Sequence, residues 1–179
     1  METLYLVKPS LAKKEEILAY KQAFTGEHLH GGSHLQQMDN FEEWLEHVEN
    51  EASPATCRPN RAPSSTFICI REQDKKQDKK MVGICNIRHH LNQEFLVHIA
   101  GHIGYSIHPN ERRKGYAKEQ LALALQEAKT LGINRVLITA ADWNIGSQKT
   151  ILANGGVYED TRIDPDDGDR MLRYWIKNL

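Results

Sequence analysis

The sequence lacks the features that mark membrane-spanning or repetitive proteins. No apolar run approaches the roughly 18 residues that a membrane helix needs, and no repeat of domain size is present. Lysine plus arginine (23) and aspartate plus glutamate (24) nearly cancel to a net charge of −1, so nucleic acid is not an expected partner. Residues 1–9 have neither the apolar core nor the cleavage site of a signal peptide. No membrane partner is therefore expected.

Cysteine is equally scarce. The three residues, Cys57, Cys69 and Cys85, form no CxxC pair and leave one thiol unmatched, which suits a reducing cytoplasm better than a disulfide framework. Cys69 and Cys85 lie inside apolar runs, where inert buried thiols are expected. Two familiar phosphate-binding motifs are also missing: Gly-x4-Gly-Lys-[Ser/Thr], and Gly-x-Gly-x-x-Gly after a strand. We expect a cytoplasmic protein.

What is present is the composition of a soluble globular domain, 40% hydrophobic and 26% charged, in a chain whose length favours one domain over residues 1–179. Apolar periodicity predicts a mixed α/β order. Strands are expected at 4–7, 66–70, 81–87, 95–107, 135–140, 157–163 and 171–176. Helices are expected from Ser10 to Phe24, over 41–48 after a capping Asp39, and at 115–131 and 144–154. Loops are expected at 26–34, 51–65 and 164–169, with a charged hairpin tip at 73–80.

The junction from Ile107 to Lys118 breaks a local rule. A strand stops at Ile107-His108-Pro109, and Arg112-Arg113-Lys114-Gly115-Tyr116-Ala117 opens the longest predicted helix. A helix start has free N–H groups and a partial positive charge, so cations there are unfavourable unless an anion joins them. Because Gly115 lets the backbone approach a bulky ligand, the junction is suited to a phosphate group. The alternative is a surface helix start with solvated arginines.

Residues 112–117 also match a known signature, [Arg/Gln]-x-x-Gly-x-[Gly/Ala]. Two further pieces follow in order: Ile103-Gly104-Tyr105-Ser106-Ile107 before the junction, then Asn144-Ile145-Gly146-Ser147 with Asn154-Gly155-Gly156-Val157 after it. Together they resemble the GNAT family of N-acetyltransferases, in a bacterial branch of predicted acetyltransferases. The resemblance implies a twisted, mostly antiparallel sheet of six to seven strands with about four helices, splayed between the fourth and fifth strands.

The resemblance further implies acetyl-coenzyme A as acetyl donor and no metal. Main-chain amides between Arg113 and Lys118 would hold its diphosphate, and main-chain groups of Ser106 and Ile107 would pair with the pantetheine arm. Asn144 would contact the arm from the other side, with Ser147 nearby; Asn144 can equally act as a helix N-cap. The expected cofactor-binding residues are Ser106, Ile107, Arg112, Arg113, Lys114, Gly115, Tyr116, Ala117, Lys118, Asn144 and Ser147.

The catalytic residues depart from the family pattern. Many members have a carboxylate on the central strand, where this chain has Gly101-His102. His102 shares a predicted strand face with His98, and can serve as base or water relay, or be structural or substrate-contacting. Ile151 stands where many relatives have a proton-donating tyrosine, so Tyr105 and Tyr158 are candidate acids by residue type. No cysteine lies near the junction to support an acyl-enzyme route.

Two functions remain open at this point. The first is transfer of an acetyl group to a primary amine of a small molecule or peptide, by direct attack in a ternary complex. The second is a non-catalytic module that binds or senses acyl-coenzyme A. His28, His30 and His34 lack the partners of a metal site and are expected to shape the acceptor site. Exposed strand edges near the carboxyl terminus make a homodimer reasonable.

Overall fold

The computed structural model describes residues 2–73 and 78–179. Its strands are β1 (Glu2–Val7), β2 (Ser64–Gln73), β3 (Asp78–Arg88), β4 (Ile103–Ile107), β5 (Arg135–Ala141), β6 (Val157–Ile163) and β7 (Arg170–Lys177). Its α-helices are α1 (Lys14–Gln22), α2 (Phe41–Glu51), α3 (Tyr116–Thr130) and α4 (Ile145–Ala153). Short helical turns are η1 (Leu11–Lys13), η2 (Leu96–Ala100) and η3 (Pro109–Glu111). The centre of the predicted charged tip, residues 74–77, lies outside the described residues.

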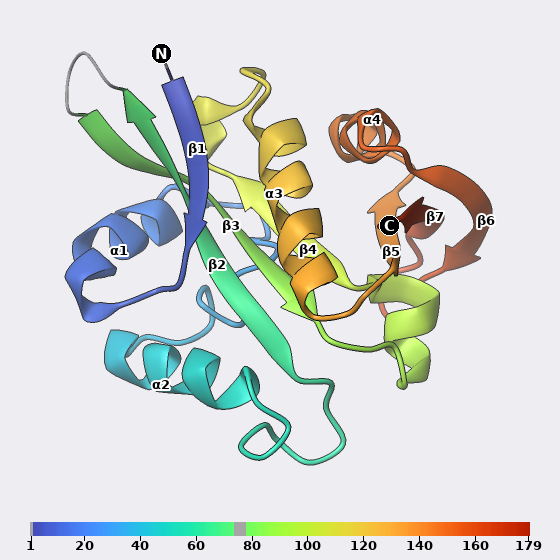
Figure 1. Cartoon of the computed structure of the whole chain (residues 1–179), viewed down its shortest axis with the longest axis horizontal. Helices are drawn as coiled ribbons and strands as arrows, with labels where there is room; N and C mark the ends of the chain where they lie inside the picture. The colour runs from blue at the N-terminus through green and yellow to red at the C-terminus, as the bar shows by residue number, and fades with distance from the viewer. Residues whose placement is uncertain (1, 74–77) are drawn as a thin grey trace.

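The strands form two antiparallel sheets, in the orders β1-β2-β3-β4 and β5-β7-β6 (Figure 1). The seven strands of the described residues and their mixed α/β order confirm the expected class. The predicted splay between the fourth and fifth strands is complete, because no ladder joins β4 to β5 in the described part of the chain. Helix α3 connects these two strands as a crossover, the usual connection between neighbouring parallel strands.

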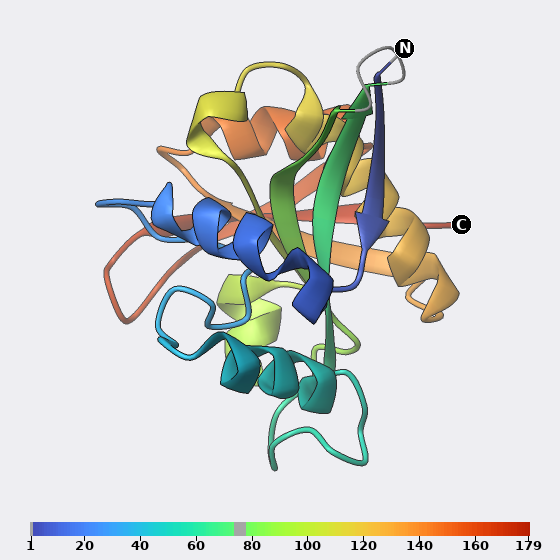
Figure 2. The same ribbon diagram turned by 90° about the vertical axis from the view of Figure 1, so that its left-hand side faces the viewer.

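Alternating strand residues give the four-stranded sheet two buried faces. Ile68, Ile70 and Ile84 pack with α1 and α2, while Cys85 and Ile87 pack with α3. Figure 2 shows α1 and α2 on one side of this sheet and α3 on the other. Both faces are therefore largely covered, and the edge of β4 that faces β5 is left unpaired among the described strands.

The long strand predicted over residues 95–107 is wrong in its first half. Residues Leu96–Ala100 form a π-helical turn, and the strand begins only at Ile103. Gly101 ends the turn with φ of 67°, and a Cβ there would lie 2.6 Å from the carbonyl oxygen of Leu137. Alternating apolar residues misled the prediction, because Leu96 and Ile99 are buried at helical spacing. His98 therefore does not share a strand face with His102.

The predicted caps are partly corrected. Asn40, not Asp39, caps α2. Its side chain accepts a hydrogen bond of 2.9 Å from the N–H of Glu43, and a donor three residues after the cap is usual for a helix N-cap. Ser10 stands before η1 without a side-chain cap bond. Asn144 caps α4 as expected.

The predicted buried thiols are confirmed. Cys69 and Cys85 are fully buried, and burial raises the pKa of Cys69 to about 12. Neither thiol is therefore a ready nucleophile. Among the described residues, no helix has the length and apolar character to span a membrane.

Candidate functional site

The opening between the two sheets begins at His102. The His102 N–H donates to the carbonyl of Leu137 at 2.8 Å, and Leu137 N–H donates to Nδ1 of His102 at 2.9 Å. These bonds join β4 to β5 at one end. Beyond them no ladder pairs β4 with β5 among the described residues, so the strand edges that end at Ile107 and Ala141 are not hydrogen-bonded to each other. We call the space between these edges the β4–β5 opening.

The amino terminus of α3 follows the open end of β4. Its cap residue, Gly115, has φ of 87° and no side-chain capping bond, and a Cβ built there meets nothing within 4 Å. Arg113 also has a positive φ, 66°, and left-handed residues in a turn direct successive amides toward one concavity. Tyr116 is buried, which fixes the first turn on the core. The free N–H groups of this turn fit a phosphate in position, charge and access.

Two of the cations at the junction form ion pairs with carboxylates of this chain. Lys114 pairs with Glu111 at 2.7 Å, and Arg112 pairs with Glu27 at 2.9 Å. Burial raises the pKa of Glu111, but hydrogen bonds from Lys114 and Lys80 outweigh it and lower the pKa to about 2. Carboxylates of this chain therefore offset part of the charge that we expected an external anion to neutralise.

The register of β4 decides which of its main-chain groups face the opening. His108 N–H donates to Val82 O at 2.8 Å, and hydrogen-bonded pairs alternate along an antiparallel ladder. The main-chain groups of Ser106 therefore point toward β3, which is at odds with the pantetheine contact expected for them. Those of Tyr105 and Ile107 face the opening. Only Ile107 O has a further partner, Nε of Arg112 at 3.2 Å.

Helix α4 begins at the end of β5 and supplies the other wall. The side-chain oxygen of Asn144 accepts from the N–H of Ser147 at 3.1 Å. Its amide nitrogen has no acceptor among the described residues, so cap and ligand contact are compatible. The hydroxyls of Tyr105 and Ser147 lie 2.8 Å apart and join β4 to α4. Burial raises the pKa of Tyr105 to about 12, although hydrogen bonds from Ser147 and Thr150 oppose it.

His102 is buried and hydrogen-bonded, unlike a general base that is free to accept a proton. It is 6% exposed, and desolvation, then the charges of Arg88 and His90, lower its pKa to about 4. Its Nδ1 already accepts a hydrogen bond, so the neutral ring must carry its proton on Nε2. Of the roles left open for His102, this geometry favours the structural one.

The remaining candidates are dispersed. Ile151 is fully buried in the core, and Tyr158 lies on β6, where its hydroxyl meets Thr161 at 2.8 Å. The loop of residues 26–34 packs on β4, since a Cβ on Gly31 would lie 2.5 Å from the carbonyl oxygen of Gly104. This loop therefore borders the face of β4 opposite α3, and its role in shaping an acceptor site stays a prediction.

The sequence interpretation missed Arg88. It ends β3 and donates through Nη1 to the carbonyls of Ala100 and Gly101, at 3.3 and 3.0 Å. The only available signal was a cation directly after an apolar strand. Its partners come from a turn that was predicted as strand, so their position could not be foreseen.

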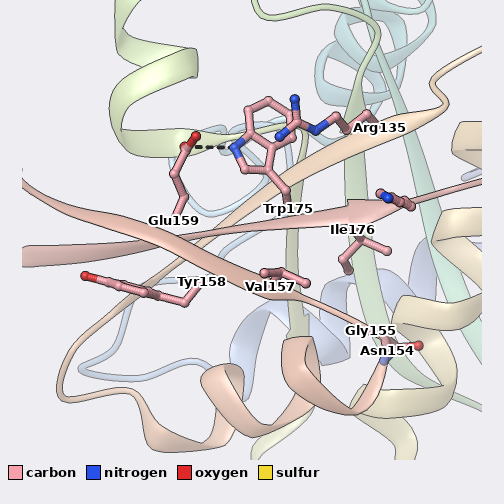
Figure 3. A pocket seen from close by; sticks show the side chains of 9 residues that line it. Arg135, Asn154, Gly155, Val157, Tyr158, Glu159, Trp175 and Ile176 are labelled. Atoms are coloured by element: carbon pink, nitrogen blue, oxygen red, sulfur yellow. Dashed lines mark hydrogen bonds between the residues drawn. The ribbon is translucent and has the colours of Figure 1, made fainter.

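Two hollows in the described chain lie away from the opening. The larger, about 570 Å³, is on the three-stranded sheet β5-β7-β6, around Val157 and Tyr158 (Figure 3). There the guanidinium of Arg135 lies 4.3 Å from the ring centroid of Trp175, whose indole N–H donates to Glu159 at 2.8 Å. The smaller, about 400 Å³, lies around Cys57 and His89. Neither is lined by an expected cofactor residue.

Comparisons with known proteins agree with this arrangement. The family model "Acetyltransferase (GNAT) domain" matches residues 3–157. A chimera of the Vibrio cholerae spermidine N-acetyltransferase SpeG and hSSAT has a TM-score of 0.63 at 16% identity, over 98% of this chain and 96% of that one. A dodecameric spermidine N-acetyltransferase structure from Vibrio cholerae has a TM-score of 0.62 at 16% identity, over 99% and 94%.

A third neighbour is the microcin C7 self-immunity acetyltransferase MccE in complex with acetyl-CoA and AMP. Its TM-score is 0.61 at 18% identity, over 97% of this chain and 92% of that one. At these identities the neighbours establish the fold. No curated protein matches the sequence. The family model covers most of the chain, including the junction, the β4–β5 opening and Asn144. The chain therefore belongs to the GNAT family of acetyltransferases.

Proposed function

We propose that the protein transfers an acetyl group from acetyl-CoA to a primary amine of a small molecule or peptide, by direct attack in a ternary complex. The observation that carries the proposal is the uncapped start of α3 at the end of β4, next to a strand edge with free main-chain groups. Acetyl-CoA supplies the activated acyl group. Amides from Arg113 to Lys118 would hold its diphosphate, with Arg112 steadying the loop through Ile107 O.

The opening has groups for the rest of such a ligand. Main-chain groups of Tyr105 and Ile107 face it from β4, and the amide nitrogen of Asn144, on the α4 side, has no acceptor in the described part of the chain. Ser147 holds the hydroxyl of Tyr105 in place. A ligand arm extended along β4 would complete the pairing that β5 does not provide, as an added strand does at a sheet edge.

Proton transfer is assigned as follows. Tyr105, whose raised pKa keeps it protonated at neutral and alkaline pH, is the candidate donor to the leaving thiolate. His102 is a poor base because its pKa is lowered to about 4 and its Nδ1 is occupied. The acceptor would therefore react as the free amine, with its proton lost to water. The rate should rise with pH through the pKa of the acceptor amine.

The second candidate, a non-catalytic acyl-CoA module, keeps the same junction and lacks turnover. The absence of a carboxylate base at residues 101–102 favours it. Thiol release measured over a panel of amines separates the two, because the sensing module would show no release above the hydrolysis background. The direct-transfer proposal fails if saturating acetyl-CoA binds and no amine is acetylated.

The cofactor site itself is tested with two matched glycines. Gly115 and Gly132 lie at opposite ends of α3, both with positive φ and both with open space at the Cβ position. Gly115→Glu should abolish binding of acetyl-CoA, because a side chain and a negative charge enter the cradle. Gly132→Glu should bind normally in calorimetric titration. Equal affinities in both variants would remove the junction from the cofactor site.

Assembly into a homo-oligomer belongs to the same proposal. β6 is an edge strand whose Val157 is 68% exposed, and a neighbour of the same fold is described as a dodecamer. Val157→Lys should shift the sedimentation coefficient toward that of a single chain. Leu11→Lys, at a similarly exposed residue on η1, is the control. A single-chain value for the unmodified protein contradicts the assembly.

A further inference from the structure

Arg88 is a cation without a carboxylate. Its Nη1 donates to Ala100 O and Gly101 O, but the residues that the structure describes provide no acceptor for Nε and Nη2. No acidic side chain among the described residues forms an ion pair with Arg88. Desolvation is the sole cause that lowers the pKa of Arg88. A desolvated charge without a partner is costly, so an external anion would be stabilised there.

Arg88 lies beside the strand that borders the opening. Its N–H donates to His102 O at 2.8 Å, at the closed end of the opening. Gly104, on the facing strand, has no side chain: a Cβ there would lie 4.0 Å from Nη2 of Arg88 and 3.5 Å from the backbone nitrogen of Gly31. Arg88 is partly exposed, which leaves its remaining N–H groups within reach of a ligand.

The face that Arg88 occupies is the one opposite α3. Ile84 on the same strand packs with α1 and α2, and Asn86 and Arg88 follow at period two on that face. The loop of residues 26–34 covers Gly104 from the same side. A ligand that reaches Arg88 would therefore approach from the side of this loop, beside the contact between Gly31 and Gly104, on the face away from α3.

The side chains around Arg88 do not supply the missing negative charge. Desolvation and then neighbouring cationic groups, Arg88 among them, lower the pKa values of His30 and His102. Glu27, a carboxylate that raises the pKa of His30, is paired with Arg112 at 2.9 Å. The imidazoles of His30 and His102 are thus neutral at pH 7, and the guanidinium of Arg88 would repel a polycation.

We propose that Arg88 binds a carboxylate of the acceptor, so that the acceptor is an amine that also carries a carboxylate, such as an amino acid or a short peptide. The planar guanidinium matches a carboxylate with two parallel N–H donors. The inference rests on the proposed function, and it separates this chain from the neighbours named for spermidine, which carries only positive charges.

The experiment compares amines that differ only in the carboxylate: lysine with cadaverine, and tyrosine with tyramine, with spermidine as the polycation. Ethanolamine and phosphoethanolamine form a third pair, which distinguishes phosphate from carboxylate. Thiol release gives kcat/KM for each amine, and calorimetry with CoA present gives its Kd. The carboxylated member of the first two pairs should be preferred by ~10-fold to 100-fold, the range of one charge-assisted contact.

Arg88→Gln should abolish this preference while it changes kcat/KM for cadaverine and tyramine by less than about threefold. Gln retains an N–H donor for the carbonyls of residues 100–101. If the role of Arg88 were merely structural, the substitution would lower kcat/KM for all acceptors alike. Arg58→Gln, at an arginine already paired with Glu51 at 2.9 Å, should leave the preference intact.

Equal use and equal binding of both members of each pair would overturn the inference, as would a preference that survives in Arg88→Gln. A preference confined to phosphoethanolamine would overturn the carboxylate assignment. If no amine is acetylated, the proposed transfer fails, yet a carboxylate-dependent Kd that is lost in Arg88→Gln would still support the binding role of Arg88.

Discussion

Nδ1 of His102 accepts a hydrogen bond from the backbone N–H of Leu137, 35 residues later in the chain, at 2.9 Å. A second bond runs in the opposite direction, from His102 N–H to Leu137 O. Together the two bonds link the start of β4 to β5 as a pair of main-chain bonds would link two neighbouring strands. His102→Ala should lower the free energy of unfolding by about 1–3 kcal/mol, because the buried N–H of Leu137 loses its acceptor.

His102→Asn is the matched control for that loss. The Asn side-chain oxygen is separated from Cα by the same number of bonds as Nδ1, so it can accept from Leu137 and retain most of the stability. Denaturant unfolding of both variants measures the difference. A catalytic base would be lost in both variants, so an Asn variant that is stable and inactive would return His102 to the chemistry.

The same residue predicts a pH dependence of stability. The pKa of His102 is about 4 in the folded chain, against an ordinary value of 6.5, so the folded state resists protonation. Stability from His102 is fully present above pH 6.5 and decreases as the pH falls toward 4, by about 3 kcal/mol in total. Unfolding measured from pH 7.5 to pH 4 should be less pH-dependent in His102→Asn. Identical profiles would contradict the lowered pKa.

The sequence predicted the parts of the site whose chemistry is local. The α3 start is readable because Arg112, Gly115 and Ala117 lie within six consecutive residues, and Asn144 is readable because a cap acts on residues just after it. The bond of His102 to Leu137 was not readable, because no spacing rule relates residues so far apart. Arg88 was missed for the same reason: its partners belong to a π-helical turn whose apolar residues alternate like those of a strand.

Two glycines in one loop test how the acceptor side is built. Gly26 and Gly31 have nearly equal φ, 77° and 78°, but only a Cβ at Gly31 would meet another backbone, at 2.5 Å from Gly104 O. Each Ala variant should lose about 1–2 kcal/mol for the left-handed conformation. Gly31→Ala should lose a further ~1–3 kcal/mol, because the loop must lift from β4. Its KM for the amine should also rise, while that of Gly26→Ala stays close to the original value. Equal losses in both variants would contradict the contact between the loop and β4.

Tyr105 provides the sharpest test of the proposed chemistry, because its hydroxyl and its packing can be separated. Tyr105→Phe keeps the ring between β4 and α4 and removes only the group that meets Ser147 at 2.8 Å. If Tyr105 protonates the leaving thiolate, kcat should fall by ~100-fold or more while the Kd of acetyl-CoA is unchanged. Ser147→Ala removes the partner but keeps the hydroxyl, so its kcat should fall much less. With a pKa of about 12, Tyr105 should cause no loss of rate up to pH 10. A Phe variant with full kcat would leave the thiolate to be protonated by water, and the pH profile would then report only the acceptor amine.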